Sequence, residues 1–480
     1  MPVSLAYRPD PRFPDLGPEF ADPVAAEAFP QTTLRFRNDR AAATVGLDTL
    51  TDAEWIAHFA RFEPLPGNID PPLAQRYHGH QFRSYNPELG DGRGFTFAQM
   101  REAPLEQGGP GRLLDLGSKG SGRTPWSRTA DGRLTLKGGV REVLATAMLE
   151  ALGVPTSRSF SLIETGEDLV RGDEPSPTRS AVLVRLSHGH IRFGSFQRHA
   201  YFEAPDRLTA LTDHVIETYY PQLTGATDRP VGLFKAVIAR SARLTARWMA
   251  AGFVHGVLNT DNMNLSGESF DYGPYRFLPH NDPNFTAAYF DQSGLYSFGR
   301  QPEAVFWNLQ QLAGALSLIA ETDALVDALN GFAGVYRSEL TAAMLDRLGM
   351  RSRNAEADAT LVQAAFRAIS EGGARLRWEP FFFDWFCGDA ARALGSPRRD
   401  LYAQAGFAEF RELMATFEPD RPERLADPYF ARPEPEELLV DQIEALWTPI
   451  AQADDWSAFH AKLAGIETAR RAWGLPAQGT

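Results

Sequence analysis

A short polar segment in the second half of the chain has the residue types that chemistry on phosphates requires. Residues 255–263 (His-Gly-Val-Leu-Asn-Thr-Asp-Asn-Met) contain Asp261 and Asn262, and Asp271 follows nine residues after Asn262. A divalent metal that bridges phosphates needs hard oxygen ligands, which the Asn262 amide and the Asp271 carboxylate supply. Asp261 is then a candidate base for the hydroxyl that attacks the phosphorus. The spacing predicts a site for a metal–nucleotide complex.

The same segment resembles the catalytic loop of small-molecule kinases that have the protein-kinase-like fold. In those kinases the loop begins His-Gly-Asp, an Asn follows, and Asp-Phe-Gly comes later. Here the His-Gly and Asn262 keep their places, but Val257 occupies the Asp position and Asp261 stands immediately before the Asn. Asp-Tyr-Gly at 271–273 stands where Asp-Phe-Gly would. We infer that the nucleotide is still bound and that the chemistry performed on it differs.

Two glycine-rich stretches upstream contain candidate phosphate-binding groups. In the first, Gly90 and Gly92 permit a tight turn whose backbone N–H groups approach a phosphate, and Arg93 adds a bidentate contact. An ordinary hairpin turn is the alternative for this pattern. In the second, at residues 115–125, Lys119 is the candidate phosphate-binding lysine, and a flexible surface loop is the alternative.

A phosphate-binding lysine of this kind needs a partner acid on the helix that follows. Apolar residues recur every four positions over residues 140–152, which predicts that helix, and Gly153 ends it. Glu142 is the best-placed partner, whereas Glu150 lies near the far end and is expected to be solvated. The chain has only four lysines among its 48 basic residues, so a retained Lys119 marks a place that needs a compact ammonium group.

Two arginines and two histidines surround the end of another expected strand, which includes residues 181–184. Arg185 and Arg192 are both candidates for facing the nucleotide cleft. His188 and His190 alternate as they would on one strand face, but no cysteine or acidic residue is close in the sequence. We therefore expect these histidines to be structural or to line the substrate, rather than to bind a metal.

The composition limits the classes of partner. Of the 480 residues 43% are hydrophobic and 23% are charged, which is ordinary for a globular protein with a sizeable core. The net charge of −13 disfavours nucleic acid as a partner. No apolar run is long enough for a transmembrane helix and no secretory signal is present, so we expect a cytoplasmic protein. The single Cys387 lies in an apolar run and is expected to be a buried structural thiol.

Secondary-structure patterns divide the chain into a strand-rich half and a helical half. The outline predicts an α+β, bilobal protein-kinase-like fold with ATP between the lobes. Residues 1–75 are proline-rich, with one helix expected at 52–61, and form an N-terminal extension packed on the core. Residues 76–204 form the N-terminal lobe, and residues 205–480 form a helical C-terminal lobe with a C-terminal helical extension. Further helices are expected at residues 303–345, 355–372, 405–417 and 436–470.

Together these motifs resemble those of the selenoprotein O family, a group of kinase-like proteins that transfer AMP from ATP to proteins. The resemblance spans residues 75–315 and weakens beyond about residue 330. Its motifs are residues 77–82, 87–93, 119–128, 131–133, 141–142, 190–194, 255–263, 271–274, 301–302 and 307–309. These motifs are long and distinctive.

The resemblance implies that ATP is bound flipped relative to ordinary kinases, with its γ-phosphate buried and its α-phosphate presented. A protein hydroxyl would attack the α-phosphorus, AMP would be transferred, and pyrophosphate would leave. Glu142 would pair with Lys119, and Asp261 would be the base. Asn262 and Asp271 would hold Mg²⁺, or Mn²⁺ in its place. The residues that would contact ATP are Gly90, Gly92, Arg93, Lys119, Asp131, Gly132, Arg185, Arg192 and Asp271.

The resemblance also implies the partners and leaves alternatives open. The substrates would be proteins with Ser, Thr or Tyr hydroxyls, including this chain itself. We expect a monomer, and the charge and hydropathy given above predict neither nucleic acid nor membrane as a partner. The terminal Cys or selenocysteine motif that is common in the family is missing at residues 476–480, so we expect no redox control through it. The alternatives are UMP transfer from UTP, conventional phosphotransfer, and a catalytically silent pseudokinase that only binds nucleotide.

Overall fold

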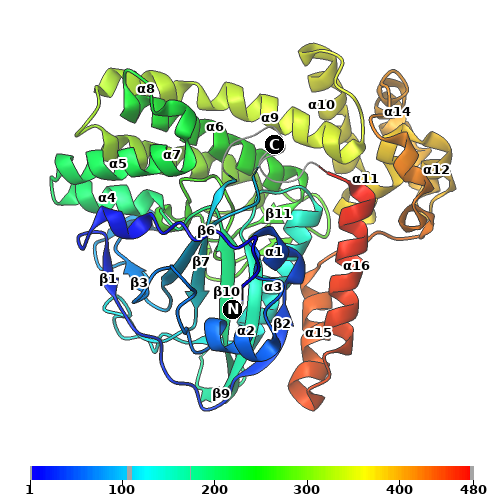
Figure 1. Cartoon of the computed structure of the whole chain (residues 1–480). Coiled ribbons are helices and arrows are strands. Elements are labelled where there is room, and N and C mark those ends of the chain that lie inside the picture. The colour runs from blue at the N-terminus through cyan, green and yellow to red at the C-terminus, as the bar shows by residue number, and fades with distance from the viewer. Residues whose placement is uncertain (1–2, 105–110, 173, 476–480) are drawn as a thin grey trace.

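A computed structural model describes residues 3–104, 111–172 and 174–475 of the chain. The N-terminal part is dominated by one antiparallel sheet, and the C-terminal part is almost entirely helical (Figure 1). The chain is therefore a mixed α/β protein in which the strands come first and the helices follow. Residues 476–480, on which the expectation about redox control rests, lie outside the described residues.

The large sheet is antiparallel between all of its neighbouring strands. Its strands are β1 (Ala21–Pro23), β2 (Thr33–Arg37), β3 (Leu73–Gln75), β6 (Thr96–Arg101), β7 (Leu113–Lys119), β8 (Leu134–Thr135), β9 (Arg158–Leu169) and β10 (Thr178–Ser187). Their order is β1-β3-β6-β7-β10-β9-β2, and β8 pairs with β10. Strands from the first 75 residues therefore belong to the same sheet as the later ones. Two small sheets lie outside it: β4 (Gly79–Gln81) pairs with β5 (Ser84–Asn86), and β11 (Phe253–Val254) with β12 (Arg276–Phe277).

Strand β10 lies in the interior of the sheet, and nearly all of its residues are buried. Residues 181–184, predicted to be a strand, are buried there between β7 and β9. The register sets Leu183 opposite Lys119 and Arg185 opposite Gly117. Residues that face each other across antiparallel strands project to the same side of the sheet. The register therefore places Lys119 and Arg185 on one face of the sheet.

Helix α3 (Leu136–Ala151) packs on that face of the sheet and carries Glu142. It begins at Leu136, four residues earlier than predicted, because the Thr135 side chain caps it by accepting a hydrogen bond from the Gly138 N–H, 3.1 Å away. The helix is followed by Gly153 in a left-handed conformation with φ 73°. The predicted apolar stripe is buried against the sheet and the helices beyond it.

The helical part and the remaining helices agree with the predicted pattern in outline but not in every boundary. The other α-helices are α1 (Asp39–Thr44), α2 (Asp52–Phe59), α4 (Phe193–Tyr201), α5 (Pro205–Tyr219), α6 (Arg229–Ala250), α7 (Gln301–Leu316), α8 (Thr322–Asn330), α9 (Phe332–Leu348), α10 (Ala355–Gly372), α11 (Trp378–Trp385), α12 (Ala390–Gly395), α13 (Arg399–Tyr402), α14 (Ala408–Met414), α15 (Val440–Ala453) and α16 (Ser457–Trp473). The helix expected at 355–372 is α10. The region 303–345 is divided into α7, α8 and α9, and 436–470 is divided at Asp454, whose φ of 51° cannot continue a right-handed helix.

Helices α15 and α16 return from the helical part to the side of the sheet (Figure 1). Asp454, between them, lies 2.7 Å from the Nη2 atom of Arg179 on β10. Glu444 of α15 lies 2.7 Å from the Nζ atom of Lys137 on α3, and α16 also packs against α3. This hairpin therefore supports the helix that carries Glu142.

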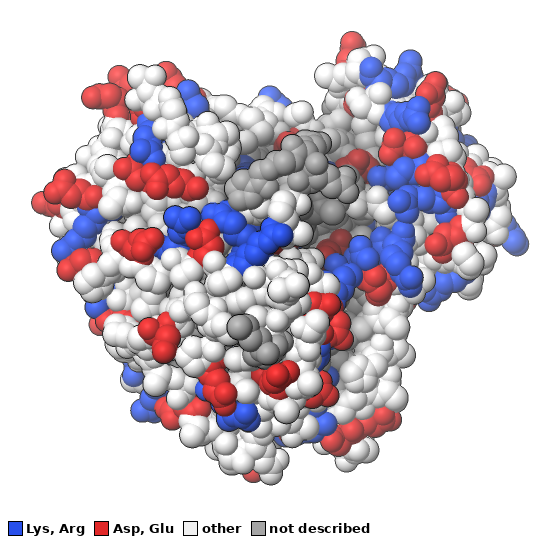
Figure 2. All heavy atoms as spheres, in the orientation of Figure 1, with Lys and Arg blue, Asp and Glu red and all other residues white. Residues whose placement is uncertain are grey.

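The apolar core extends over both faces of the sheet and continues among the C-terminal helices. Cys387 is 6% exposed within the part of the core that the C-terminal helices form, which confirms that its thiol is buried. None of the helices in the described ranges has both the length and the apolar character needed to cross a membrane. Acidic and basic side chains are interspersed over the face seen in Figure 2.

Candidate active site

Lys119, the last residue of β7, lies between two carboxylates. Its Nζ atom lies 2.5 Å from Oε2 of Glu142 and 2.8 Å from Oδ1 of Asp271. The Lys119 side chain is 4% exposed and that of Glu142 is fully buried, so water screens this pair very little. Three residues that are far apart in the sequence therefore meet here, from a strand, a helix and a loop.

Asp271 is held ionised in an uncommon backbone conformation. Its φ of 65° is left-handed, which few residues other than glycine adopt. Its Oδ1 atom also accepts a hydrogen bond from Nη1 of Arg185, 3.2 Å away. Burial raises the pKa of the Asp271 carboxyl, but Lys119 and Arg185 outweigh burial and hold the pKa well below its usual value. The next residue, Tyr272, is buried, and its hydroxyl bonds to that of Thr156, which anchors the loop.

Two hydrogen bonds fix the loop after β11. The Nε2–H of His255 donates to the carbonyl of Phe270, 3.0 Å away, and burial lowers the pKa of His255, which favours the neutral ring. This bond ties the loop to the residue before Asp271. The Nδ2–H of Asn262 donates to the carbonyl of Val257, 2.9 Å away. The backbone of Val257 thus orients the Asn262 amide, and the described residues donate no hydrogen bond to its Oδ1 atom.

Asp261 has the environment of a general base. It lies in the 3₁₀ helix η3 (Thr260–Asn262) and is 8% exposed. Its Oδ1 atom is buried and has no hydrogen-bond partner within the described ranges. Burial raises the pKa of this carboxyl to about 6, against the opposing charge of Arg192. A carboxylate with this pKa accepts protons efficiently near neutral pH.

Arg192 connects Asp261 to the glycine-rich turn. It precedes α4, and its Nη1–H donates to the backbone carbonyl of Asp261, 3.1 Å away. Its Nη2 atom lies 3.3 Å from Oδ1 of Asp91, and its guanidinium stands 4.1 Å from the centre of the Tyr77 ring. Arg93, by contrast, forms no side-chain ion pair with any residue that the structure describes. It lines a cavity that Arg192 and Asp261 also line.

Two adjoining cavities meet at Arg93 and Lys119, which line both of them. Their volumes of 290 and 450 Å³ suit a small-molecule site, for which about 300–1,000 Å³ is typical. Glu142 lines the larger cavity. The predicted residues that line the smaller one are Gly90, Gly92, Arg93, Lys119, Arg185, Arg192, Asp261 and Asp271. The gathering of basic side chains here suits an anion with several negative charges.

Asp131 and Gly132 are not among the described residues that line these cavities. Asp131 pairs with Arg171 at 2.8 Å, and Gly132 has a left-handed φ of 71°. The carbonyl of Gly132 accepts a hydrogen bond from the Gly122 N–H, 3.2 Å away. The structure shows both residues shaping the loop after β7, and their neighbour Arg133 lines the larger cavity together with Arg171.

Several lining residues carried no predicted role. Tyr77, Trp126 and Arg128 all line the smaller cavity. Each lies in one of the motifs that carried the resemblance, beside a glycine-rich turn, and that position was the signal that could have identified them. A Cβ atom on Gly90 would lie 2.3 Å from the Trp126 ring, so this position requires glycine. Trp126 thereby closes one side of the cavity.

His188 and His190 each have an acidic partner that lies far away in the sequence. His188 pairs with Glu268, and Nδ1 of His190 lies 3.5 Å from Oδ2 of Asp115. Within the described ranges, no group of three or more His, Cys, Asp or Glu side chains gathers to hold a metal ion. The separate pairs support a structural role for both histidines.

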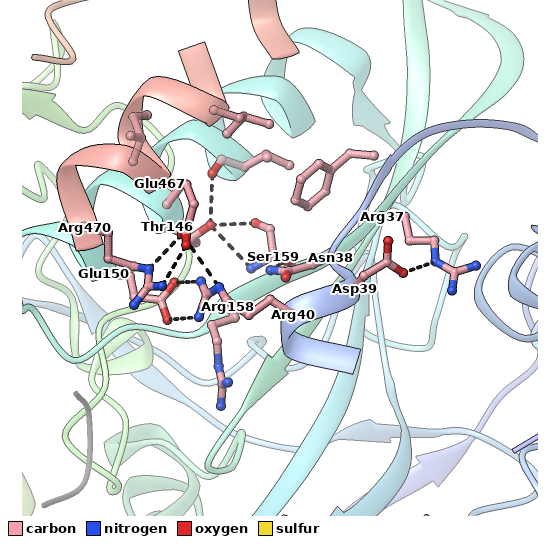
Figure 3. A pocket seen from close by; sticks show the side chains of 15 residues that line it. Arg37, Asn38, Asp39, Arg40, Thr146, Glu150, Arg158, Ser159, Glu467 and Arg470 are labelled. Atoms are coloured by element: carbon pink, nitrogen blue, oxygen red, sulfur yellow. Dashed lines mark hydrogen bonds and ion pairs between the residues drawn. The ribbon is translucent and has the colours of Figure 1, made fainter. Parts of the chain in front are cut away.

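Another cavity, of about 310 Å³, lies beside α3 and is lined also by residues of β2, α1 and α16 (Figure 3). Its charged side chains bind one another: Arg40 pairs with Glu150, and Nη2 of Arg470 lies 2.7 Å from Oε1 of Glu467. Glu150, the less favoured partner for Lys119, is thus engaged elsewhere. The ionic groups in this cavity are paired, whereas the Arg93 side chain and Oδ1 of Asp261 in the cleft at Lys119 have no ion-pair or hydrogen-bond partner among the described residues, so we place the candidate active site in that cleft.

Comparisons with known proteins identify the family. The family model described as "Protein adenylyltransferase SelO" matches residues 3–467. A protein of Synechococcus elongatus named "Protein nucleotidyltransferase YdiU" is 45% identical, and the match covers 96% of this chain and 94% of that protein. Proteins of the same name from Synechocystis sp. and Pseudomonas putida are 43% and 37% identical, covering 95% and 83% of this chain and 97% and 79% of those proteins. The match includes the C-terminal helices, where the motif resemblance had weakened. The chain belongs to the SelO family of protein adenylyltransferases.

Proposed function

We propose that this chain transfers AMP from ATP to Ser, Thr or Tyr hydroxyls of proteins and releases pyrophosphate. The relatives are named protein nucleotidyltransferases, which supports nucleotidyl transfer to a protein. The observation that carries the proposal is the buried Oδ1 atom of Asp261, which lacks a described partner and lies beside a cavity lined by basic side chains. A base next to an anion site is what attack by a hydroxyl on a phosphorus atom requires.

The proposed architecture is a bilobal protein-kinase-like fold with the nucleotide between the sheet and the helices. The buried pair of Lys119 on a strand and Glu142 on a helix supports it, as does the loop with Asn262 and Asp271. In this architecture residues 76–204 form the N-terminal lobe and residues 205–480 the helical lobe. Residues 1–75 are then an N-terminal extension that contributes strands to the sheet.

ATP is proposed to enter the cleft with its triphosphate end first. The smaller cavity supports this orientation because its walls carry Arg93, Lys119, Arg185 and Arg192. One guanidinium group can bind two phosphate oxygens at once, and a lysine ammonium adds a compact charge. The γ-phosphate would occupy this cavity, and the α-phosphate would lie nearer to Asp261. An adenine ring fits the surroundings poorly, since a buried guanidinium requires an anionic or hydrogen-bonding partner.

The reaction in this arrangement is an in-line displacement at the α-phosphorus. The oxygen of a substrate hydroxyl forms a bond to that phosphorus while the bond to the bridging oxygen of the β-phosphate breaks. The hydroxyl proton passes to Oδ1 of Asp261, and pyrophosphate carries away the electron pair of the broken bond. Lys119 and the arginines stabilise the negative charge that develops on pyrophosphate.

A divalent cation is proposed to bind at the Asn262 amide and the Asp271 carboxylate. Asn262 and Asp271 would hold Mg²⁺, or Mn²⁺, through one amide and one carboxylate oxygen. Two protein ligands are enough for this ion, because phosphate oxygens and water complete its coordination. When bound, the ion supplies additional positive charge at the transferred group.

Labelled nucleotides test the proposal. Transfer of label to protein from [α-³²P]ATP, and not from [γ-³²P]ATP, is the expected result, whereas label from the γ position alone would show conventional phosphotransfer. Label from [α-³²P]UTP in preference to [α-³²P]ATP would show uridylyl transfer. A silent pseudokinase would show neither, and its ATP binding would be its only activity. Mass spectrometry for an AMP adduct on acceptor proteins and on this chain itself completes the test.

A further inference from the structure

Helix α4 leads from Asp261 to the surface of the molecule, and it is buried up to residue 197. Helix α4 begins after Arg192, beside Asp261, and ends at Tyr201, and both Tyr201 and the following Phe202 are exposed. The β4–β5 hairpin lies beside the helix and also contacts η3. A Cβ atom on Gly79 of this hairpin would lie 3.1 Å from Oδ1 of Asp261, so the hairpin directly adjoins the candidate base.

Arg198, on α4, is a positive charge without a carboxylate of its own. Its Nη1 atom lies 2.9 Å from Nε2 of His78, and its guanidinium stands 5.1 Å from the centre of the Trp126 ring and 5.0 Å from that of Phe202. It forms no ion pair with any residue in the described ranges. Asp22, whose charge acts on Arg198, is already paired with Arg76. Arg198 is therefore left without a carboxylate partner among the described residues, in a protein whose net charge is −13.

The side chain of Arg198 is held in place while remaining partly accessible. The Nη1–H donates to Nε2 of His78, and the Nδ1–H of His78 therefore donates to the Tyr85 hydroxyl, 2.7 Å away. Arg198 itself is half-buried, and an arginine keeps its charge at all ordinary pH values. A fixed guanidinium loses little conformational freedom when it binds a carboxylate.

Exposed aromatic rings surround this charge. Tyr201 is 56% exposed and Phe202 is 51% exposed, although large apolar side chains usually avoid water. The Tyr85 and Tyr201 rings are stacked with their centres 5.6 Å apart. Arginine with tyrosine and other aromatic residues is the composition found at the centre of protein–protein interfaces. We call the surface formed by Arg198, Tyr85, Tyr201 and Phe202 the α4 shelf.

The α4 shelf adjoins the nucleotide cavity. Trp126 lines that cavity, and Arg198 stands over the same ring. Arg198 on α4 follows Arg192, the residue that precedes the helix, by six positions. At 1.5 Å per residue, this is about 9 Å, which an extended peptide spans with about three residues.

We propose that the α4 shelf docks an extended segment of the protein substrate that carries an Asp or Glu about three residues from the modified hydroxyl. The carboxylate would bind the Arg198 guanidinium, and apolar neighbours of the acid would pack on Tyr201 and Phe202. This inference rests on the proposed function, because it places the acceptor hydroxyl at Asp261. It names a substrate class that neither the family nor the relatives' names specify.

Biotinylated peptide pools test this proposal with two readouts. Each pool has a fixed Ser, one further position fixed as Glu, Gln or Lys at one to five residues on either side, and mixed residues elsewhere. We expect label from [α-³²P]ATP to enter the best-placed Glu pool about tenfold more than the matching Gln pool. Streptavidin capture of each pool, with the bound enzyme then quantified, measures docking without any transfer.

Three variants separate docking from other effects. Arg198→Gln is expected to lose the preference for Glu, and Arg198→Glu is expected to turn it into a preference for Lys. Arg207→Gln, which changes a partly exposed arginine on α5 that pairs with Glu19, is the matched control and should keep the wild-type preference. Stabilisation by ATP against thermal unfolding should be the same in all of them, which shows that each variant is folded and binds nucleotide.

The outcomes distinguish failure of this inference from failure of the proposed function. If the wild-type protein labels Glu and Gln pools equally, or if Arg198→Gln keeps the Glu preference, the docking proposal is wrong while nucleotidyl transfer stands. If no pool is labelled at all, the proposed transfer fails for peptides. The amount of enzyme that each pool captures then tests docking by itself. Retention by Glu pools that Arg198→Gln abolishes would then support the α4 shelf, and equal retention would overturn it.

Discussion

The guanidinium of Arg192 donates a hydrogen bond to the backbone carbonyl of Asp261, 3.1 Å away, and not to its carboxylate. The arginine thereby positions the residue without occupying its side-chain oxygen. The Oδ1 atom is left without a partner within the described ranges, and burial raises the pKa of the carboxyl to about 6. This relationship makes Asp261 available as a base at neutral pH.

Replacing Asp261 with Asn tests its role directly. The amide keeps the shape of the side chain but cannot accept the hydroxyl proton, so transfer should fall by about 10²–10⁴-fold. The affinity for ATP should change by no more than about twofold, since Asp261 is assigned to the acceptor and not to the triphosphate. Label incorporation and calorimetric titration with ATP measure the two quantities. Asp441→Asn, at an exposed position on α15, is the control and should change neither. Normal transfer by Asp261→Asn would remove this residue from the mechanism.

The pH dependence of transfer should reflect the raised pKa of Asp261. Below pH 6 the carboxyl is protonated and cannot act as a base, so kcat/KM should rise through a midpoint near pH 6 and then level off. The positive charge of Arg128 lowers this pKa, so Arg128→Gln should move the midpoint to higher pH. A profile measured with a fixed acceptor protein checks both statements. A midpoint near pH 4, the ordinary range of an aspartate, would contradict the assignment.

The buried pair of Lys119 and Glu142 should matter for both stability and nucleotide binding. In Glu142→Gln the lysine loses one of its two charged partners in a site from which water is excluded, so we expect a loss of about 1–3 kcal/mol in the free energy of unfolding. Glu150→Gln is the matched control on the same helix. It weakens only the more accessible pair with Arg40 and should cost less than about 1 kcal/mol. Chemical denaturation and ATP titration of both variants provide the comparison. Equal losses in the free energy of unfolding would show that the Lys119–Glu142 pair stabilises the protein no more than the Arg40–Glu150 pair does.

Asp271 should confer the metal dependence of ATP binding. In the wild-type protein, we expect ATP to raise the melting temperature more with Mg²⁺ than with EDTA. Asp271→Asn removes the carboxylate ligand, so this difference should disappear and transfer should fall by about 10²-fold or more. Asp327→Asn, on the exposed face of α8, should keep the difference. Thermal unfolding with each metal measures it. A Mg²⁺ effect that persists in Asp271→Asn would place the ion elsewhere.

Asp271 should not produce the acidic limb of the pH profile. Lys119 and Arg185 hold its pKa well below its usual value, so its carboxylate stays ionised throughout the range in which Asp261 titrates. Since a depressed pKa contributes stability above the unfolded value, that contribution should be lost only in strong acid. Unfolding measured between pH 7 and pH 5 should therefore show little change that depends on Asp271.

Several features of the site followed from the sequence because they depend on local chemistry and spacing. The loop with Asp261 and Asn262 and the later Asp271 could be found from residue types at fixed distances along the chain. The helix of Glu142 followed from an apolar period of four, and its boundaries shifted only because Thr135 caps it earlier. The patterns of glycine and apolar residues likewise predicted that the strands come first and the helices later.

Other features depend on contacts between distant residues, which no local pattern contains. The approach of Asp271 to Lys119 depends on a loop that lies against the end of a strand 152 positions earlier in the chain. Asp131 lies in a matching motif, yet its side chain pairs with Arg171 and lies outside both cavities. The single helical pattern at 303–345 likewise gave no sign of its division into three helices.

The sequence by itself determined the family motifs, the candidate base, the candidate metal ligands and the lysine–glutamate pair. The tertiary structure alone decided that Oδ1 of Asp261 is buried without a described partner and that Arg198 stands charged among aromatic rings beside the cleft. The physical reason is that a pKa, a cavity and a docking surface are set by burial and by charges that the fold brings together. Residue types can be read along the chain, whereas their surroundings exist only in the folded protein.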